Sequence, residues 1–266
     1  MPAGLKFENT MVETQTSKVM KTLICSLLIL TSSLFMVFVS CHKTENSIDP
    51  KVTPNDFLSG TKYDKLIIEV NYVSGYEPTE ATINSMVSFL ETKINKPGGI
   101  EIQKKEISSG QTSFYTLTDI QNIEKHNRKN TISGNTLAAY ILFIDKDYSL
   151  NANTQSKVLG ITYGKSSIVI FENTIRQYSG GITQPSVTRL ETIVVEHEFG
   201  HLLGLTNNGS KMQVSHQDSP NGSHCSNENC LMHYSVETTD VIDNLMNNIP
   251  TLDNNCLNDL KANGGK

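Results

Sequence analysis

The chain contains no tryptophan, and only 7% of its 266 residues are aromatic. Platforms that stack sugars or nucleic-acid bases are built from aromatic side chains, so this scarcity argues against both. An excess of positive charge is also missing, because the formal net charge is −5 and the pI is about 5.8. Since nucleic-acid binding needs lysine and arginine clustered against the phosphates, we expect no nucleic-acid partner.

The N-terminus has the pattern of an export signal. Lys18 and Lys21 precede an apolar run without charge at residues 22–39. A positively charged start followed by an apolar centre is typical of a secretory signal sequence. Because Met20 also begins a conventional signal peptide, we interpret residues 1–19 as a misassigned upstream start and leave them out of the fold.

The end of this run resembles the lipobox of bacterial lipoproteins. In that motif a small residue precedes a cysteine that is cleaved at its amino side and acylated, and residues 38–41 (Phe-Val-Ser-Cys) match it. The resemblance implies that residues 1–41 are a signal sequence with its lipobox. The chain would then be exported and attached through lipid to a bacterial membrane, on the periplasmic or cell-surface face. An uncleaved anchor is the alternative, since the run approaches the roughly 20 residues that cross a bilayer core.

Residues 42–60 are polar, with two prolines and no periodicity, and indicate a tether that leads to one domain at 61–266. Apolar spacing in the domain predicts strands at 65–70, 99–107, 137–144, 158–163 and 167–171, and helices at 79–94, 117–128 and 185–205. The domain opens with a βαβ unit, the strand at 137–144 is apolar enough to be central, and the last two strands form a sheet edge. A last helix is indicated near 241–246.

The strongest chemical signal is His197-Glu198-Phe199-Gly200-His201, on the expected helix at 185–205. Histidines four residues apart project from one face of a helix about one turn apart, so both reach a single zinc ion. The helix is otherwise apolar, and two buried imidazoles without partners would be unfavourable. Glu198 is placed to act as a general base on a zinc-bound water. We therefore expect Zn²⁺ as the cofactor.

The pattern His197-Glu198-x-x-His201-x-x-Gly204 resembles the metzincin clan of zinc peptidases. A glycine at this position ends the helix in a left-handed conformation and turns the chain back under the metal. The clan pattern continues with x-x-His, but Asn207 stands at that place. Several downstream side chains could replace the missing histidine: His216, Asp218, His224 and His233.

The segment His224-Cys225-x4-Cys230-x-Met232 resembles the archaemetzincin pattern H-C-x4-C-x-M, in which the histidine is the third zinc ligand. The resemblance implies that His224 completes the site after a loop of 19 residues at 205–223 in place of the clan's two, a lengthening that a surface loop tolerates. His216 remains the alternative third ligand. A different kind of zincin would use a downstream glutamate, either Glu228 or Glu237.

Met232 matches the Met-turn of metzincins, a tight turn whose methionine forms an apolar floor beneath the zinc. The segment 231–234 also resembles astacins and serralysins, where a tyrosine two residues after the methionine approaches the metal and stabilises the oxyanion. By resemblance, Tyr234 has that catalytic role. Without the upstream helix, a methionine and a tyrosine in a loop core would be the ordinary interpretation.

Cys225, Cys230 and Cys256 are the cysteines beyond the signal sequence. Archaemetzincins continue with a further C-x-x-C that completes a second, structural zinc site, whereas only Cys256 follows here. Three thiolates could bind zinc together with a histidine or an aspartate. For an exported chain we favour a disulfide instead, either Cys225–Cys230 or Cys230–Cys256.

These features predict an α+β, zincin-like (metzincin-like) fold. In it a twisted mixed sheet packs against two helices, the second carries the zinc ligands, and an irregular C-terminal subdomain contains the Met-turn. By resemblance, residues 158–164 are the edge strand that pairs with an extended protein or peptide substrate. The implied function is a membrane-anchored zinc endopeptidase. The alternative is a catalytically inactive zinc-binding lipoprotein that acts as a binding or adhesion module, against which Glu198 argues.

Overall fold

The computed structural model describes residues 51–239 and 249–266. The expected signal sequence, the first part of the tether and the helix near 241–246 lie outside these residues. Within the described ranges, no helix is both long and apolar enough to cross a bilayer.

A five-stranded sheet forms the centre of the domain, with the strand order β2-β1-β3-β5-β4. Its strands are β1 (Lys65–Val73), β2 (Ile100–Ile107), β3 (Thr136–Phe143), β4 (Gly160–Tyr163) and β5 (Ser167–Ile170). Neighbouring strands are parallel except for β4, which runs antiparallel to β5 at one edge. The predicted mixed sheet, its central strand and its edge pair are therefore confirmed.

The opening βαβ unit consists of β1, α3 (Glu80–Lys93) and β2. Thr79 is the N-cap of α3, and its hydroxyl accepts a hydrogen bond from the Thr82 amide. Side-chain caps of this kind satisfy one of the free amides of the first turn and fix where the helix begins. The helix predicted at 79–94 is thereby confirmed to within one residue at each end.

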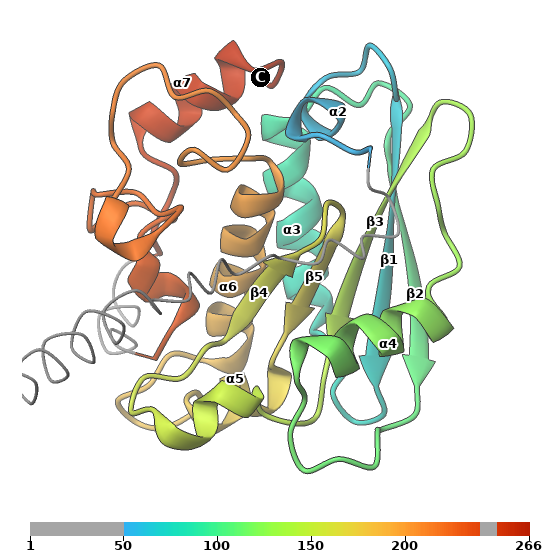
Figure 1. The fold of residues 1–266 in the computed structure, drawn as a ribbon, viewed down its shortest axis with the longest axis vertical. Coiled ribbons are helices and arrows are strands. Elements are labelled where there is room, and N and C mark those ends of the chain that lie inside the picture. Colours follow the sequence, from blue (N-terminus) through green and yellow to red (C-terminus); the bar gives the residue numbers. More distant parts are fainter. Residues whose placement is uncertain (1–50, 240–248) are drawn as a thin grey trace, which may run out of the picture. The chain divides into compact units, whose positions relative to one another are not determined.

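Both faces of the sheet are covered. Along β3, Leu137, Ala139, Ile141 and Phe143 join the apolar cluster under α3 and α6 (Val187–Leu202), whereas Tyr140 and Leu142 face the other side. That second face carries α4 (Leu117–Asn127), whose Ile120 is fully buried in the smaller cluster. Figure 1 shows α4 on one face of the sheet and α3 with α6 on the other. Helix α4 is the helix expected at 117–128, and it packs on the sheet as a third helix where only two were expected to do so.

Residues 51–60 differ from the expected tether, because they pack into the domain. Helix α2 (Pro54–Leu58) buries Phe57 and Leu58 in the main core. The buried ammonium of Lys96 donates hydrogen bonds to three backbone carbonyls of this region, those of Asp56, Ser59 and Tyr63. The segment is polar on average, but burial of Phe57 and Leu58 is enough to fix it to the core. The folded domain therefore begins before residue 61.

After β5 the chain forms α5 (Glu172–Gln177) and then α6, and the residues described after α6 are mostly irregular apart from α7 (Asn254–Ala262). Short 3-10 helices interrupt the loops: η1 (Ser149–Asn153), η2 (Ser219–Asn221) and η3 (Tyr234–Glu237). The sequence did not predict α5 or α7, because both are short and largely polar. The orange and red segments that follow α6 lie beside that helix (Figure 1), and η3 contacts it.

Candidate metal centre

Helix α6 brings His197 and His201 together. Ser186 is the N-cap of the helix and accepts a hydrogen bond from the Arg189 amide. One turn separates the two histidines, and their Nε2 atoms lie 3.1 Å apart. His197 is fully buried, and burial lowers the pKa of His201 to about 4. A neutral imidazole is the form that binds a metal, so this burial favours ligation.

The helix ends as the glycine in the motif indicates. Gly204 has a φ of +80°, and its amide donates to the His201 carbonyl. The next amide, that of Leu205, donates to the Gly200 carbonyl at 3.1 Å. These two hydrogen bonds form a Schellman motif, which reverses the chain direction at the left-handed residue. A Cβ at Gly204 would also lie 2.6 Å from the side chain of Pro54 in α2, so glycine is required for packing as well.

The loop after this turn returns to the helix with His224. The Nε2 atoms of His201 and His224 lie 3.3 Å apart, and His224 is 7% exposed. Asn207, which stands where the metzincin pattern has its third histidine, is exposed, and its amide donates to Gln217. The structure therefore brings His224 to the histidine pair and leaves Asn207 in the loop.

The outward nitrogens of two histidines have backbone partners. His197 Nδ1 lies 2.6 Å from the Leu231 carbonyl, and His224 Nδ1 lies 2.6 Å from the Asn221 carbonyl. Because a carbonyl only accepts, each Nδ1 must carry the proton and each Nε2 keeps a free lone pair. This arrangement is typical of histidines that bind a metal, where the second nitrogen fixes the tautomer and the orientation of the ring.

A fourth side chain, Glu237 at the end of η3, completes this cluster. Its Oε2 lies 3.7 Å from the Nε2 atoms of His197 and His201, and 3.4 Å from that of His224. Four atoms bound to zinc at 2.0–2.1 Å in a tetrahedron lie about 3.3–3.4 Å apart. The separations of 3.1–3.7 Å therefore fit one tetrahedral ion of this size held by three nitrogens and one oxygen.

Met232 lies under the helix against Gly200. The methionine is fully buried, and a Cβ on Gly200 would lie 2.1 Å from its Sδ. Only a glycine leaves room for the sulfur at this point between the two histidines. The turn around Met232 is held by its carbonyl, which accepts from the Cys225 amide at 2.7 Å. Through this contact the residue next to His224 is joined to the methionine turn.

Glu198 points from α6 toward the edge strand β4. The Thr162 hydroxyl lies 2.9 Å from its Oε2 and 2.7 Å from its backbone carbonyl. A Cβ on Gly160 would lie 2.8 Å from its Oε1, and this oxygen has no hydrogen-bond partner among the described residues. Burial raises the pKa of Glu198 well above its ordinary value of 4.5, and the nearby Glu237 raises it further. Burial and the charge of Glu237 thus increase the affinity of this carboxyl group for a proton.

Tyr234, the candidate oxyanion stabiliser, begins η3 and is partly exposed. Its ring packs against that of His233, with 4.6 Å between the centroids. Among the described contacts, none joins its hydroxyl to the three histidines. Its catalytic role stays a prediction.

A second cluster of ligand atoms lies under the C-terminal region. It consists of His216, Cys225, Asp253 and Cys256, whose ligand atoms lie within 4.8 Å of one another. His216 Nδ1 lies 3.4 Å from Cys225 Sγ, and its Nε2 lies 2.8 Å from an Asp259 oxygen. His216, the alternative third ligand, is therefore placed in this cluster and not with the histidine pair.

The three thiols of Cys225, Cys230 and Cys256 are buried and unpaired, so the expected disulfide is not formed in this structure. Cys230 Sγ and Cys256 Sγ lie 3.7 Å apart. A disulfide requires about 2.05 Å, whereas two thiolates bound to one zinc ion at about 2.3 Å in a tetrahedron lie roughly 3.8 Å apart. At 3.7 Å the two sulfur atoms are too far apart for a covalent pair, and Cys230 is not among the ligand atoms of the second cluster.

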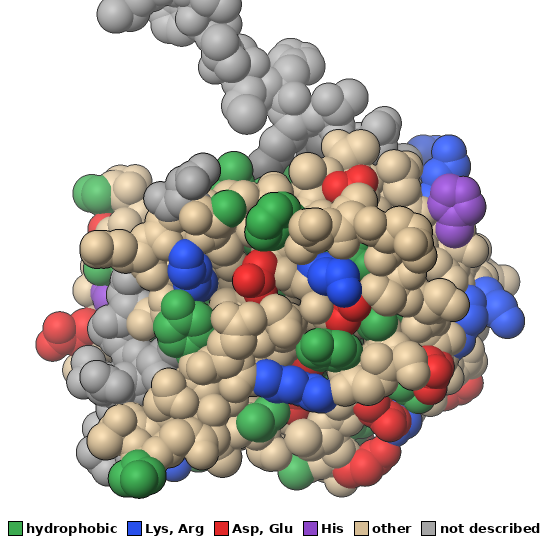
Figure 2. All heavy atoms as spheres, turned by 90° about the horizontal axis from the view of Figure 1, so that it is seen from below, with side chains coloured by type: hydrophobic (Ala, Val, Ile, Leu, Met, Phe, Trp, Pro, Cys, Tyr) green, Lys and Arg blue, Asp and Glu red, His purple; other side chains and the backbone are tan. Residues whose placement is uncertain are grey.

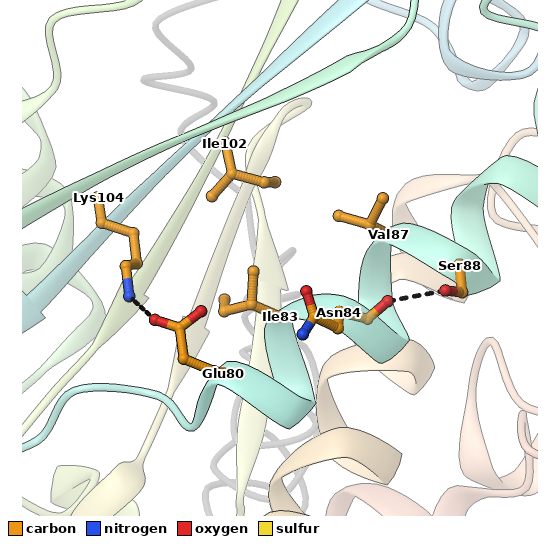
Figure 3. A pocket seen from close by; sticks show the side chains of 7 residues that line it. All are labelled: Glu80, Ile83, Asn84, Val87, Ser88, Ile102 and Lys104. Atoms are coloured by element: carbon orange, nitrogen blue, oxygen red, sulfur yellow. Dashed lines mark hydrogen bonds and ion pairs between the residues drawn. The ribbon is translucent and has the colours of Figure 1, made fainter.

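The surface offers other hollows away from these ligands. A groove of about 630 Å³ lies between α3 and the opposite sheet edge, β2, where Glu80 and Lys104 form an ion pair (Figure 3). None of its lining residues belongs to either cluster. On the face shown in Figure 2, acidic and basic side chains are interspersed, and neither sign forms a continuous field there.

Comparisons with known proteins give distant likenesses only. No family's sequence profile matches the chain, and no match is found among curated proteins. Among solved structures, the chain is similar to an archaemetzincin from Methanopyrus kandleri, with 16% identity and a TM-score of 0.45 over 75% of this chain and 96% of that one. It is also similar to metalloproteinase-II from Bacteroides fragilis, with 17% identity and a TM-score of 0.40 over 76% of this chain and 54% of that one. Because these similarities are distant, a functional assignment depends on the side chains of this chain itself.

Two residues at the site were missed by sequence reasoning. Gly160 and Thr162 contact Glu198 only because β4 packs against α6, and the sequence offers no local signal for that contact. The sequence allows Glu237 as the third ligand of a different zincin, whereas the structure places it beside all three histidines.

Proposed function

We propose that the chain is a zinc-dependent endopeptidase. The observation that carries this proposal is the convergence of three Nε2 atoms, from His197, His201 and His224, next to a buried glutamate on the same helix. A site that only stored a metal would have no use for the Glu198 carboxyl group buried between the metal ligands and a sheet edge. Hydrolysis at a metal uses such a group as its base.

Zinc held by the three histidines would lower the pKa of a bound water and polarise the substrate carbonyl. Glu198 would take the proton of the attacking water on its unpartnered Oε1 and pass it to the leaving amine. Thr162 holds the other carboxylate oxygen and so fixes the direction of that transfer. Tyr234 is proposed to stabilise the charge that develops on the carbonyl oxygen.

The proposed substrate is an extended protein or peptide segment. Strand β4 is the last strand of the sheet, with β5 as its only neighbour in the sheet order. An edge of this kind binds an extended peptide through main-chain hydrogen bonds. Because Gly160 and Thr162 in β4 contact Glu198, a peptide bound along β4 would lie beside the general base.

The test compares the wild-type chain, prepared without its signal sequence, with Glu198→Ala on a mixed peptide library. We expect both proteins to bind zinc and only the wild type to cleave peptides. A loss on the order of 10²-fold or more is expected for removal of a general base. Zinc binding without cleavage by either protein would favour the inactive binding module.

A further inference from the structure

Glu237 is in a position that a hydrolytic zinc site ordinarily leaves to water. Catalytic zinc sites have three protein ligands and an open fourth position, whereas closed tetrahedral sites have four protein ligands. Here the Glu237 carboxylate lies at 3.4–3.7 Å from each of the three histidine nitrogens. No other described carboxylate belongs to this group of ligand atoms.

The backbone of Glu237 is held on the same edge that the proposed substrate would use. The Leu159 amide donates to the Glu237 carbonyl at 2.8 Å, and the Thr239 amide donates to the Lys157 carbonyl at 3.0 Å. Val158 and Thr238 form an antiparallel bridge between these two hydrogen bonds. Residues 237–239 therefore pair, like a short strand, with the segment that leads directly into β4.

These two features have a common consequence. A peptide that pairs along the edge from residue 157 onward competes with residues 237–239 for the same backbone groups. A water or a substrate carbonyl at the metal competes with the Glu237 carboxylate for the same coordination position. Moving one short segment would therefore open both the metal and the start of the edge strand.

We propose that Glu237 is a fourth protein ligand of the metal, and that residues 234–239 are a latch that keeps the centre closed at rest. The proposal rests on the function proposed above and adds its regulation. In the closed state the metal is saturated by three imidazoles and one carboxylate. Opening requires Glu237 to leave and residues 237–239 to separate from residues 157–159, which a peptide bound along the edge would favour.

The test measures metal binding first, because that readout does not depend on cleavage. Wild type, Glu237→Gln and Glu237→Ala are each titrated with Co²⁺ against a chromophoric chelator, and the visible spectrum of each complex is recorded. Loss of a partner one shell outside a metal already costs roughly 10–100-fold in affinity, and we expect at least this loss for a ligand. The spectrum should change as solvent replaces the carboxylate. Glu228→Gln, an exposed carboxyl group in the same region, is the matched control and should behave as wild type.

The second measurement is the affinity for acetohydroxamate, a small chelator that needs an open metal position. We expect Glu237→Gln to bind it at least about tenfold more tightly than wild type, since no carboxylate must be displaced. Far-UV circular dichroism of each variant shows whether the fold is kept. Wild-type Co²⁺ affinity, spectrum and hydroxamate affinity in a folded Glu237→Gln would overturn the latch.

The two proposals fail in different ways. If Glu237→Gln alters the metal spectrum and affinity but no form cleaves peptides, the ligand assignment holds and the peptidase proposal fails. If wild type cleaves peptides and Glu237→Gln leaves both metal readouts unchanged, the peptidase proposal holds and the latch fails.

Discussion

Position 200 requires glycine for a steric reason that the sequence motif does not indicate. A methyl group there would meet Met232 Sδ at 2.1 Å, far inside van der Waals contact. Alanine is the better helix former by up to about 1 kcal/mol, so an unhindered Gly→Ala change would stabilise the helix. Overpacking costs about 1–3 kcal/mol, which exceeds the gain in helix propensity, so the net effect of Gly200→Ala is destabilising.

We therefore predict that Gly200→Ala lowers the free energy of unfolding, measured by urea denaturation, and weakens zinc binding. Gly181→Ala is the control, because its new methyl group would meet only the end of the flexible Gln184 side chain. The loss of unfolding free energy caused by Gly200→Ala should be smaller in a chain that also carries Met232→Ala than in the wild-type chain. Strict additivity of the two changes would show that the contact is not the cause.

Glu172 makes the free energy of unfolding depend on pH. It is fully buried, with Arg176 bound to Oε1 and no partner for Oε2 among the described residues. Burial, followed by the charge of Glu191, raises its pKa from 4.5 to about 8. The folded protein thus binds a proton that the unfolded chain releases. The resulting stabilisation is complete below pH 4.5 and is lost as the pH rises through about 8.

Glu172→Gln removes this term. We predict that the wild type loses more stability between pH 5 and pH 8 than Glu172→Gln does, as measured by thermal unfolding of the zinc-saturated proteins. Glu91→Gln, which changes an exposed carboxyl group, should follow the wild type. Equal pH slopes for wild type and Glu172→Gln would refute the assignment.

At the scale of elements, the proposed function depends on the packing of α6 against β4. Glu198 and Thr162 are far apart in sequence and meet only because the edge strand β4 packs against α6. The Thr162 hydroxyl lies 2.9 Å from Glu198 Oε2, and the proposed mechanism gives it the role of orienting the carboxylate. Misplacing a catalytic group by about 1 Å costs up to roughly 10²-fold in rate.

Thr162→Val keeps the shape of the side chain and removes the hydroxyl. We predict a fall of roughly 10–100-fold in kcat/KM for peptide cleavage, with zinc content unchanged. Thr162→Ser restores a hydroxyl and should recover most of the activity. A fully active Thr162→Val would mean that Glu198 is oriented by other contacts.

Periodicity predicted the strands and the helices α3, α4 and α6, because apolar residues recur in each at the spacing of its secondary structure. It missed α7, a short and largely polar helix of nine residues that buries Cys256, Asp259 and Leu260. It also assigned α2 to the tether, since only the fold shows that Phe57 is in the core. His197 and His201 could be predicted from helical geometry, whereas the place of Glu237 depends on loop and sheet contacts that no local rule encodes.

At the scale of the whole molecule, the proposed site would be carried on a lipid anchor outside the described residues. The motif at 38–41 predicts acylation of Cys41. The expected signal segment contains a second cysteine, Cys25, which lies outside the motif and serves as an internal control. A lipid on Cys41 would hold the catalytic domain at a membrane surface through the residues after position 41.

We predict that Cys41→Ser abolishes incorporation of labelled palmitate and releases the protein from the membrane fraction, whereas Cys25→Ser does neither. Membrane association of Cys41→Ser without a label would instead identify an uncleaved anchor. Continued labelling of Cys41→Ser would rule out the lipobox.

The central claim is that His197, His201 and His224 together hold one zinc ion. Anomalous diffraction from crystals of the zinc-loaded protein, recorded at the zinc absorption edge, locates the metal directly. The account predicts a peak about 2.0–2.1 Å from the Nε2 atoms of all three histidines. A map whose only zinc peak lies at the second cluster, beside His216 and Cys225, would contradict it.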